Sequence, residues 1–185
     1  MGKFTFYETS IKGVFIIEPF LYGDERGYFM ETYNKDDFSN AGILSTFVQD
    51  NQSSSHKGVL RGLHFQKVYQ QAKLVRVIKG EVFDVAVDLR RESPTWGKYV
   101  SVVLSAEKKN QLFIPKGFAH GFLVLSDEAE FTYKCDDFYH PEDEGGIPWN
   151  DNLVEISWPI SQNLTPSISL KDMKYKSLVE NKIFL

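Results

Sequence analysis

The chain has 185 residues, of which 42% are hydrophobic and 25% are charged, and its formal net charge is −4. This length and apolar content suit one globular unit over residues 1–185 better than two domains. The acidic balance argues against nucleic-acid binding and against an anionic membrane surface, and no membrane-length apolar run or signal-peptide pattern is present. Cys135 is the single cysteine, which suits a reducing compartment, so we expect a cytoplasmic protein.

Short segments rich in β-branched and aromatic residues recur along the chain and predict β-strands, with Gly, Pro, Asn or Asp between nearly all of them. Lys79 and Gly80 join two of these segments and predict a tight hairpin. So many short strands at close spacing indicate an all-β sandwich or barrel. The predicted strands cover residues 14–17, 27–33, 73–78, 81–88, 98–104, 111–114, 121–125 and 129–134.

Helix signals are confined to two places. Asn34 can cap a short helix over residues 35–41, which Gly42 would end. Ser169 with Asp172 three residues later has the spacing of a capping box and predicts a second helix near the C-terminus.

Polar side chains interrupt the predicted strands, and each allows two interpretations. Strand alternation places Lys73 on one face with Val75 and Val77, where it is either a functional cation or a lysine whose ammonium reaches water at a strand end. Asp84 and Asp88 share a face that is either solvated or part of a site.

Two histidines and a tyrosine leave similar alternatives open. His64 is either a core histidine bonded to a backbone carbonyl or a member of a concave polar site, and the polar groups around it favour the site. His120 follows a Pro-Lys-Gly turn and is either a turn residue or a site residue. Tyr133 is either a core aromatic or a site residue.

Two segments about fifty residues apart resemble the halves of a cupin metal site. They are Gly58-Val-Leu-Arg-Gly-Leu-His64-Phe-Gln66 and Pro115-Lys-Gly-Phe-Ala-His120. Gln66 stands where metal-binding cupins have a second histidine, and Lys73 stands where they have a glutamate. An ammonium among the ligands would repel a metal ion, so we expect no metal site. A histidine near a lysine suits acid–base chemistry on an anionic intermediate.

An ordered set of motifs along nearly the whole chain resembles the dTDP-4-dehydrorhamnose 3,5-epimerases. The motifs include residues 23–31, 47–53, 59–66, 73–77, 80–90, 93–95, 113–122, 133–134, 144–151 and 158–159. The resemblance implies a cupin-type jelly roll with a few short helices, a homodimer that exchanges N-terminal strands, a dTDP-sugar substrate and no cofactor.

In this family a ketone at C4 acidifies the protons on C3 and C5 of the sugar. The resemblance implies that His64 is the base, that Asp172 orients it, that Lys73 faces the enolate oxygen and that Tyr133 is the acid on the opposite face. The implied substrate-binding residues are Arg26, Glu31, Gln49, Asp50, Asn51, Arg61, His120, Tyr139, Glu144 and Lys171. Among them Arg26, Arg61 and Lys171 would bind the diphosphate, and Tyr139 would stack on the thymine.

Other functions remain open at this stage. An enzyme of the same fold could invert C3 alone or isomerise the ketone. A metal-dependent cupin oxygenase is a different class, which Gln66 and Lys73 disfavour. A sugar-nucleotide binding module without catalysis is a third class, which the combination of His64, Lys73 and Tyr133 disfavours.

Overall fold

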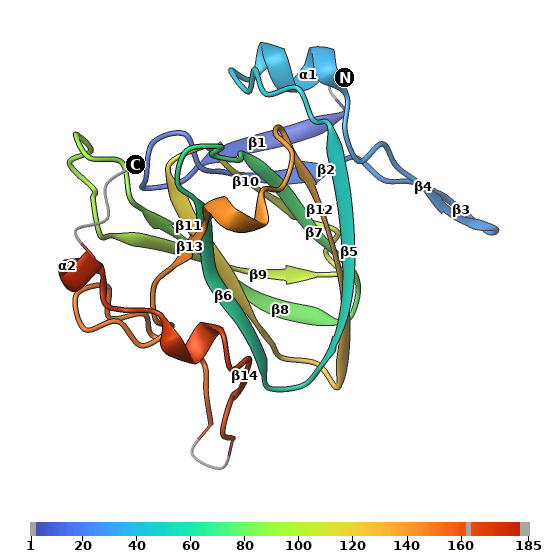
Figure 1. The fold of residues 1–185 in the computed structure, drawn as a ribbon. Coiled ribbons are helices and arrows are strands. Elements are labelled where there is room, and N and C mark those ends of the chain that lie inside the picture. Colours follow the sequence, from blue (N-terminus) through green and yellow to red (C-terminus); the bar gives the residue numbers. More distant parts are fainter. Residues whose placement is uncertain (1–2, 162–163, 182–185) are drawn as a thin grey trace.

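The computed structural model describes residues 3–161 and 164–181, which form two facing β-sheets with a few short helices at the edges (Figure 1). The first sheet contains, in spatial order, β1 (Phe4–Glu8), β2 (Phe15–Pro19), β10 (Gln111–Ile114), β7 (Lys73–Lys79), β12 (Glu128–Cys135) and β5 (Gln49–His56). The second contains β13 (Glu144–Gly146), β6 (Val59–Gln66), β11 (Phe118–Val124), β8 (Glu81–Asp88) and β9 (Tyr99–Ser105), with β14 (Ser167–Ile168) beside β6. This architecture confirms the predicted all-β fold class.

The remaining elements are short. β3 (Tyr22–Asp24) and β4 (Gly27–Phe29) form a separate two-stranded ribbon that projects away from the sandwich (Figure 1). The helices are α1 (Lys35–Asn40), α2 (Leu178–Asn181) and the 3₁₀ turns η1 (Pro141–Asp143) and η2 (Asp172–Lys174). None of the helices in residues 3–161 and 164–181 has the length and apolar character needed to cross a membrane.

The main core lies between the two sheets. Val75 and Phe131 from the first sheet pack in one cluster with Val82, Ala86 and Phe122 from the second. Because side chains alternate along a strand, Lys73 and Tyr133 have the same orientation as Val75 and Phe131. The strand pattern therefore directs one ammonium and one phenol toward the interior of the sandwich.

Helix α1 covers the outer face of the first sheet at one end. Asn34 caps it as predicted, since the side-chain oxygen accepts hydrogen bonds from the backbone N–H groups of Asp36 and Asp37. Phe38 is buried against Phe4, Ile17 and other apolar residues of that face. The prediction of this helix is confirmed.

The predicted hairpin at Gly80 is wrong. β7 and β8, which flank Gly80, belong to different sheets, so the chain passes here from one sheet to the other. Gly80 has φ of +75°, and a Cβ there would lie 2.1 Å from the carbonyl oxygen of Glu128. Only glycine fits this corner.

A solvated face for Asp84 and Asp88 is also wrong, because both side chains are fully buried. β8 lies between β11 and β9, and Ala86, which shares their face, belongs to the main core. Asp88 accepts hydrogen bonds from Arg90, Ser93 and Thr95, which satisfy its charge inside the protein. Asp84 pairs instead with a histidine.

Candidate active site

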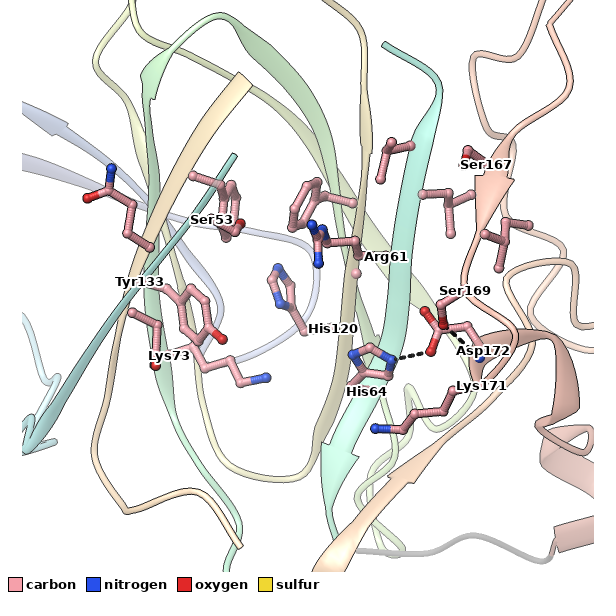
Figure 2. A pocket seen from close by; sticks show the side chains of 18 residues that line it. Ser53, Arg61, His64, Lys73, His120, Tyr133, Ser167, Ser169, Lys171 and Asp172 are labelled. Carbon is pink, nitrogen blue, oxygen red and sulfur yellow. Dashed lines mark hydrogen bonds and ion pairs between the residues drawn. The ribbon is translucent and has the colours of Figure 1, made fainter. Parts of the chain in front are cut away.

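A cavity of about 590 Å³ opens between the two sheets, with the C-terminal segment along one side. A second cavity of about 370 Å³ shares Asn51, His64, Lys73, Tyr133 and Lys171 with it, so the two adjoin. Figure 2 shows His64 and Asp172 on one side of the larger cavity and Lys73 and Tyr133 across from them. The two cavities form one site with facing polar walls.

His64 and Asp172 are far apart in the sequence, and the pairing of β14 with β6 brings them into contact. β14 runs parallel to β6, which brings the segment after β14 beside His64. His64 Nε2 lies 2.8 Å from Asp172 Oδ1, and Asp172 Oδ2 accepts a hydrogen bond from the backbone N–H of Gly62. With Nε2 engaged by the carboxylate, the other ring nitrogen faces the cavity (Figure 2). This is the geometry of an oriented base.

Asp172 remains a carboxylate although it is buried. Burial favours its neutral form, but the hydrogen bonds from His64, Gly62 and Ser169 hold its pKa below the usual value. Ser169 Oγ accepts a hydrogen bond from the backbone N–H of Asp172 at 3.0 Å, as a capping box requires. Where the sequence predicts a helix, the structure has only the 3₁₀ turn η2, and the Asp172 side chain bonds His64.

Lys73 extends its ammonium group into the cavity instead of toward bulk water (Figure 2). Within the described residues, its Nζ forms no hydrogen bond or ion pair, and it lies 5.9 Å from the centre of the Tyr133 ring. Burial lowers the pKa of Lys73, although the neighbouring Cys135, Asp84 and Glu144 oppose this shift. An enclosed cation without a partner is prepared to bind an anionic oxygen in the cavity.

Tyr133 lies on β12, across the cavity from His64 (Figure 2). Its side chain is half-buried, and burial raises the pKa of its hydroxyl, with smaller contributions from Cys135 and Glu144. The hydroxyl is therefore protonated at neutral pH and can donate a proton from the side opposite His64.

His120 belongs to β11 and is not a turn residue. It pairs with His64 in the β11–β6 register, and its Nε2 lies 3.0 Å from each carboxylate oxygen of the buried Asp84. The ring stacks near Phe131 and lines the cavity. A buried carboxylate thus fixes the orientation of a histidine at the back of the site.

Glu144 organises the mouth of the site. It accepts hydrogen bonds from Lys171 Nζ at 2.5 Å, from the Tyr175 hydroxyl at 3.1 Å and from the Tyr139 hydroxyl. Burial opposes ionisation, but Lys171, Tyr139 and the nearby His64 hold the pKa of Glu144 below its usual value. The hydrogen bond to Glu144 raises the pKa of Tyr139 to about 12. Gln49, which accepts from the Tyr139 backbone N–H and donates to Asn51, completes this wall.

Most of the predicted site residues line these two cavities, but Arg26, Glu31 and Asp50 do not. Arg26 lies in the β3–β4 ribbon, where it pairs with Asp24. Glu31 bonds Lys3 and Asn34. Asp50 points to the opposite face of β5 from Gln49 and Asn51, because side chains alternate along a strand, and it pairs with Lys134 there.

Sequence reasoning did not identify two residues that line neither cavity but hydrogen-bond to residues of the site. The sequence leaves Asp84 as either solvated or part of a site, although its place in the centre of a strongly apolar strand favours burial. Tyr175 stands next to His64 and Glu144, but it belongs to no motif that could have identified it.

No group of three or more His, Cys, Asp and Glu side chains is placed to hold a metal ion within residues 3–161 and 164–181. The positive charge in this cavity comes from Lys73, with Lys171 and Arg61 nearer its edge.

Comparison with known proteins identifies the family. The sequence model described as dTDP-4-dehydrorhamnose 3,5-epimerase matches residues 8–180. A dTDP-4-dehydrorhamnose 3,5-epimerase from Methanothermobacter thermautotrophicus is 55% identical over 185 residues, which is 100% of each chain. An epimerase from Legionella pneumophila, solved in complex with dTDP-4-keto-L-rhamnose, superposes with a TM-score of 0.93 at 49% identity over 98% of this chain and 97% of that one.

A structural relative with a narrower activity is also similar. A 3′-monoepimerase from Streptomyces bikiniensis, solved with dTDP-quinovose, superposes with a TM-score of 0.88 at 31% identity over 95% of this chain and 89% of that one. Because the family model and the full-length relatives agree with the motifs, the chain belongs to the dTDP-4-dehydrorhamnose 3,5-epimerase family and is an isomerase, as its sequence predicted.

Proposed function

We propose that the chain converts dTDP-4-dehydro-6-deoxy-D-glucose into dTDP-4-dehydro-L-rhamnose by inverting C3 and C5. The observation that carries this proposal is the ammonium of Lys73, which has no ion-pair partner in the described part of the chain and lies between the His64–Asp172 pair and Tyr133. Proton removal beside the C4 ketone places negative charge on its oxygen. An ammonium without a protein partner is the group that such an oxygen would bind.

The proposed reaction is a proton exchange across the sugar ring. His64 removes the proton from C3 or C5 on one face, and Asp172 stabilises the imidazolium that forms. The electron pair moves to the ketone oxygen, which becomes an enolate beside Lys73. Tyr133 returns a proton to the same carbon from the opposite face, and solvent then restores both side chains. Each carbon is inverted with no net change in atoms or charge.

Incubating the enzyme with its proposed substrate in deuterated water tests the reaction directly. Solvent exchange at His64 and Tyr133 should place deuterium at both C3 and C5 of the product, which NMR distinguishes. Deuterium at C3 alone would identify a 3-epimerase like the Streptomyces bikiniensis relative. Binding without any exchange would contradict the proposal.

Tyr133→Phe should separate exchange from inversion. The variant keeps the ring but lacks the proton donor, so His64 can still remove a proton and return one from solvent to the same face. We expect the rate of inversion to fall by about 10²–10³-fold, while deuterium still enters the substrate with retention of configuration. Equal loss of exchange and inversion would show that Tyr133 does not act as the separate acid. Tyr99→Phe, at a tyrosine of β9 that lines neither cavity, is the control.

Arg61 and Lys171 are the groups of this chain that suit the diphosphate. Arg61 Nε donates to Ser55 Oγ at 3.0 Å, and its two terminal nitrogens have no partner among the described residues. Both side chains line the larger cavity, where a guanidinium and an ammonium match phosphate oxygens.

We also propose that the chain works as a homodimer in which the β3–β4 ribbon enters the site of the partner. Tyr28 and Phe29 in this ribbon are 57% and 66% exposed, and an isolated two-stranded ribbon is marginally stable. Arg26 lies in the same ribbon, outside both cavities of its own chain. A second copy would cover the aromatic residues and receive the Arg26 guanidinium.

Mixed dimers test this arrangement. Arg26→Ala and His64→Ala chains are each assayed alone and after mixed refolding, at substrate concentrations below KM. If Arg26 acts on the partner's site, a mixed dimer contains one intact site and recovers a substantial part of the activity. If Arg26 acts within its own chain, every site keeps one defect and no activity returns. A monomer by light scattering would also contradict the proposal.

We infer that this activity belongs to the cytoplasm. Support comes from Cys135, whose buried thiol is free and whose pKa burial raises to about 11, so it is an unreactive thiol and not a disulfide partner.

A further inference from the structure

Tyr175 lies directly behind the proposed base. Its ring centre is 5.9 Å from that of His64, with the two planes at 70°. The residue lines neither cavity, so it belongs to the supporting layer of the site. The pairing of β14 with β6 carries this part of the C-terminal segment alongside His64.

The neighbouring strand leaves room for the Tyr175 ring. Gly146 of β13 pairs with His64, and a Cβ at Gly146 would lie 2.4–2.6 Å from three carbons of the Tyr175 ring. Gly146 has no positive φ, so space and not backbone conformation requires glycine here. The ring therefore packs directly over Gly146 and beside His64.

The hydroxyl of Tyr175 binds a charge close to the base. It donates to Glu144 Oε1 at 3.1 Å, and this oxygen lies 3.9 Å from His64 Nε2, the nitrogen that also binds Asp172. Burial and the charge of Glu144 raise the pKa of Tyr175, which keeps its hydroxyl protonated and donating at neutral pH. The groups around His64 and Glu144 are Asp172, Lys171, Tyr139 and Tyr175, with Lys73 across the cavity.

We propose that Tyr175 is a positioning residue for epimerisation, whose ring fixes the plane of His64 and whose hydroxyl fixes Glu144 and its distance from the base. The inference rests on the proposed role of His64. Three donors, Lys171, Tyr139 and Tyr175, bind the Glu144 carboxylate. Without the Tyr175 hydroxyl, the carboxylate would attract a protonated His64 more strongly. A more strongly attracted imidazolium is a weaker proton donor and needs a higher pH to become the free base.

Tyr175→Phe tests the role of the hydroxyl while it keeps the ring over Gly146. We expect kcat to fall about 3–10-fold, as the net loss of one ordinary hydrogen bond gives. The acid limb of the kcat/KM profile should move to higher pH. Tyr99→Phe, whose hydroxyl accepts a hydrogen bond from the Ser157 backbone far from His64, should change neither quantity.

Two further variants test the role of the ring. Tyr175→Leu and Gly146→Ala, which remove or displace it, should lower kcat by about 10²-fold. Unchanged kcat and pH profile in Tyr175→Phe, together with unchanged kcat in a folded Tyr175→Leu variant, would overturn the inference. If Tyr175→Leu does not fold, the pH profile of Tyr175→Phe alone tests the inference, and an unchanged profile would overturn it. His64→Asn is measured in parallel: full activity there would refute the proposed base, whereas an inactive His64→Asn with normal Tyr175 variants would refute only the role of Tyr175.

Discussion

Replacing His64 with alanine should lower kcat for epimerisation by about 10⁴-fold, because the variant lacks the base that Asp172 orients. Deuterium exchange at C3 and C5 should disappear with it, since both carbons would lose the same group. A loss of exchange at one carbon only would show that a second base serves the other, and His120, held by Asp84 at the back of the cavity, would be the group to replace next.

His64→Asn makes this test sharper. Asp172 is buried, and removing its partner leaves the carboxylate without the hydrogen bond from His64. Asparagine can still donate an N–H to Asp172, but it cannot accept a proton from carbon. Both variants should therefore be inactive, while asparagine preserves the thermal unfolding midpoint better than alanine. The control is His56→Ala, at an exposed histidine of β5 that should tolerate the change. Activity in His64→Asn would contradict the role of base.

The first sheet shows where sequence patterns succeed and where they fail. The alternation in residues 73–79 correctly places Lys73 on the same face as Val75 and Val77, which belong to the core, but it leaves open whether the ammonium lies in a site or reaches water. β5, with the sequence Gln-Asp-Asn-Gln-Ser-Ser-Ser-His, was not predicted, since it has no β-branched or apolar residue. It forms a strand because β12 supplies a hydrogen-bonded partner along its whole length. Several of the polar side chains of β5 line the site, which accounts for the unusual composition of this strand.

The pairing of distant segments could be predicted only through family resemblance. His64 and Asp172 are 108 residues apart, and nothing in the local sequence indicates that β14 runs beside β6. The predicted capping box at Ser169 did form its backbone hydrogen bond, yet Asp172 bonds His64, so the local pattern described half of its role. The local sequence predicts the turn, but tertiary contacts determine which partner the Asp172 side chain binds.

Lys73→Met should inactivate the enzyme and make it more stable. Among residues 3–161 and 164–181 the ammonium has no hydrogen-bond or ion-pair partner, so no described group replaces the hydration that it loses on folding. Methionine fills a similar volume without this penalty. We expect kcat to fall by about 10³-fold, because the enolate would lose the positive charge that faces it. The thermal midpoint should rise by about 2–4 °C, which corresponds to about 1 kcal/mol of stability in a chain of this size.

The stability difference should depend on pH in a defined direction. Burial lowers the pKa of Lys73 in the folded chain, against Cys135, Asp84 and Glu144, whereas the unfolded chain keeps the ordinary value of 10.5. Below the lowered pKa both states are protonated and the penalty is complete. Between the two values the unfolded chain binds more protons, so the stability of the parent enzyme rises with pH. The advantage of Lys73→Met should therefore be largest below the lowered pKa and shrink toward pH 10.5.

Lys79→Met is the matched control for this experiment. Lys79 lies on the same strand, but it is exposed and pairs with Glu128 at 2.6 Å. Its replacement should leave kcat unchanged and should not stabilise the chain. If Lys73→Met were less stable than the parent at neutral pH, the ammonium would have a partner that offsets its burial. It would then not be free for an enolate. A gain in stability with loss of activity would instead show that the fold tolerates a destabilising charge at the position where catalysis needs it.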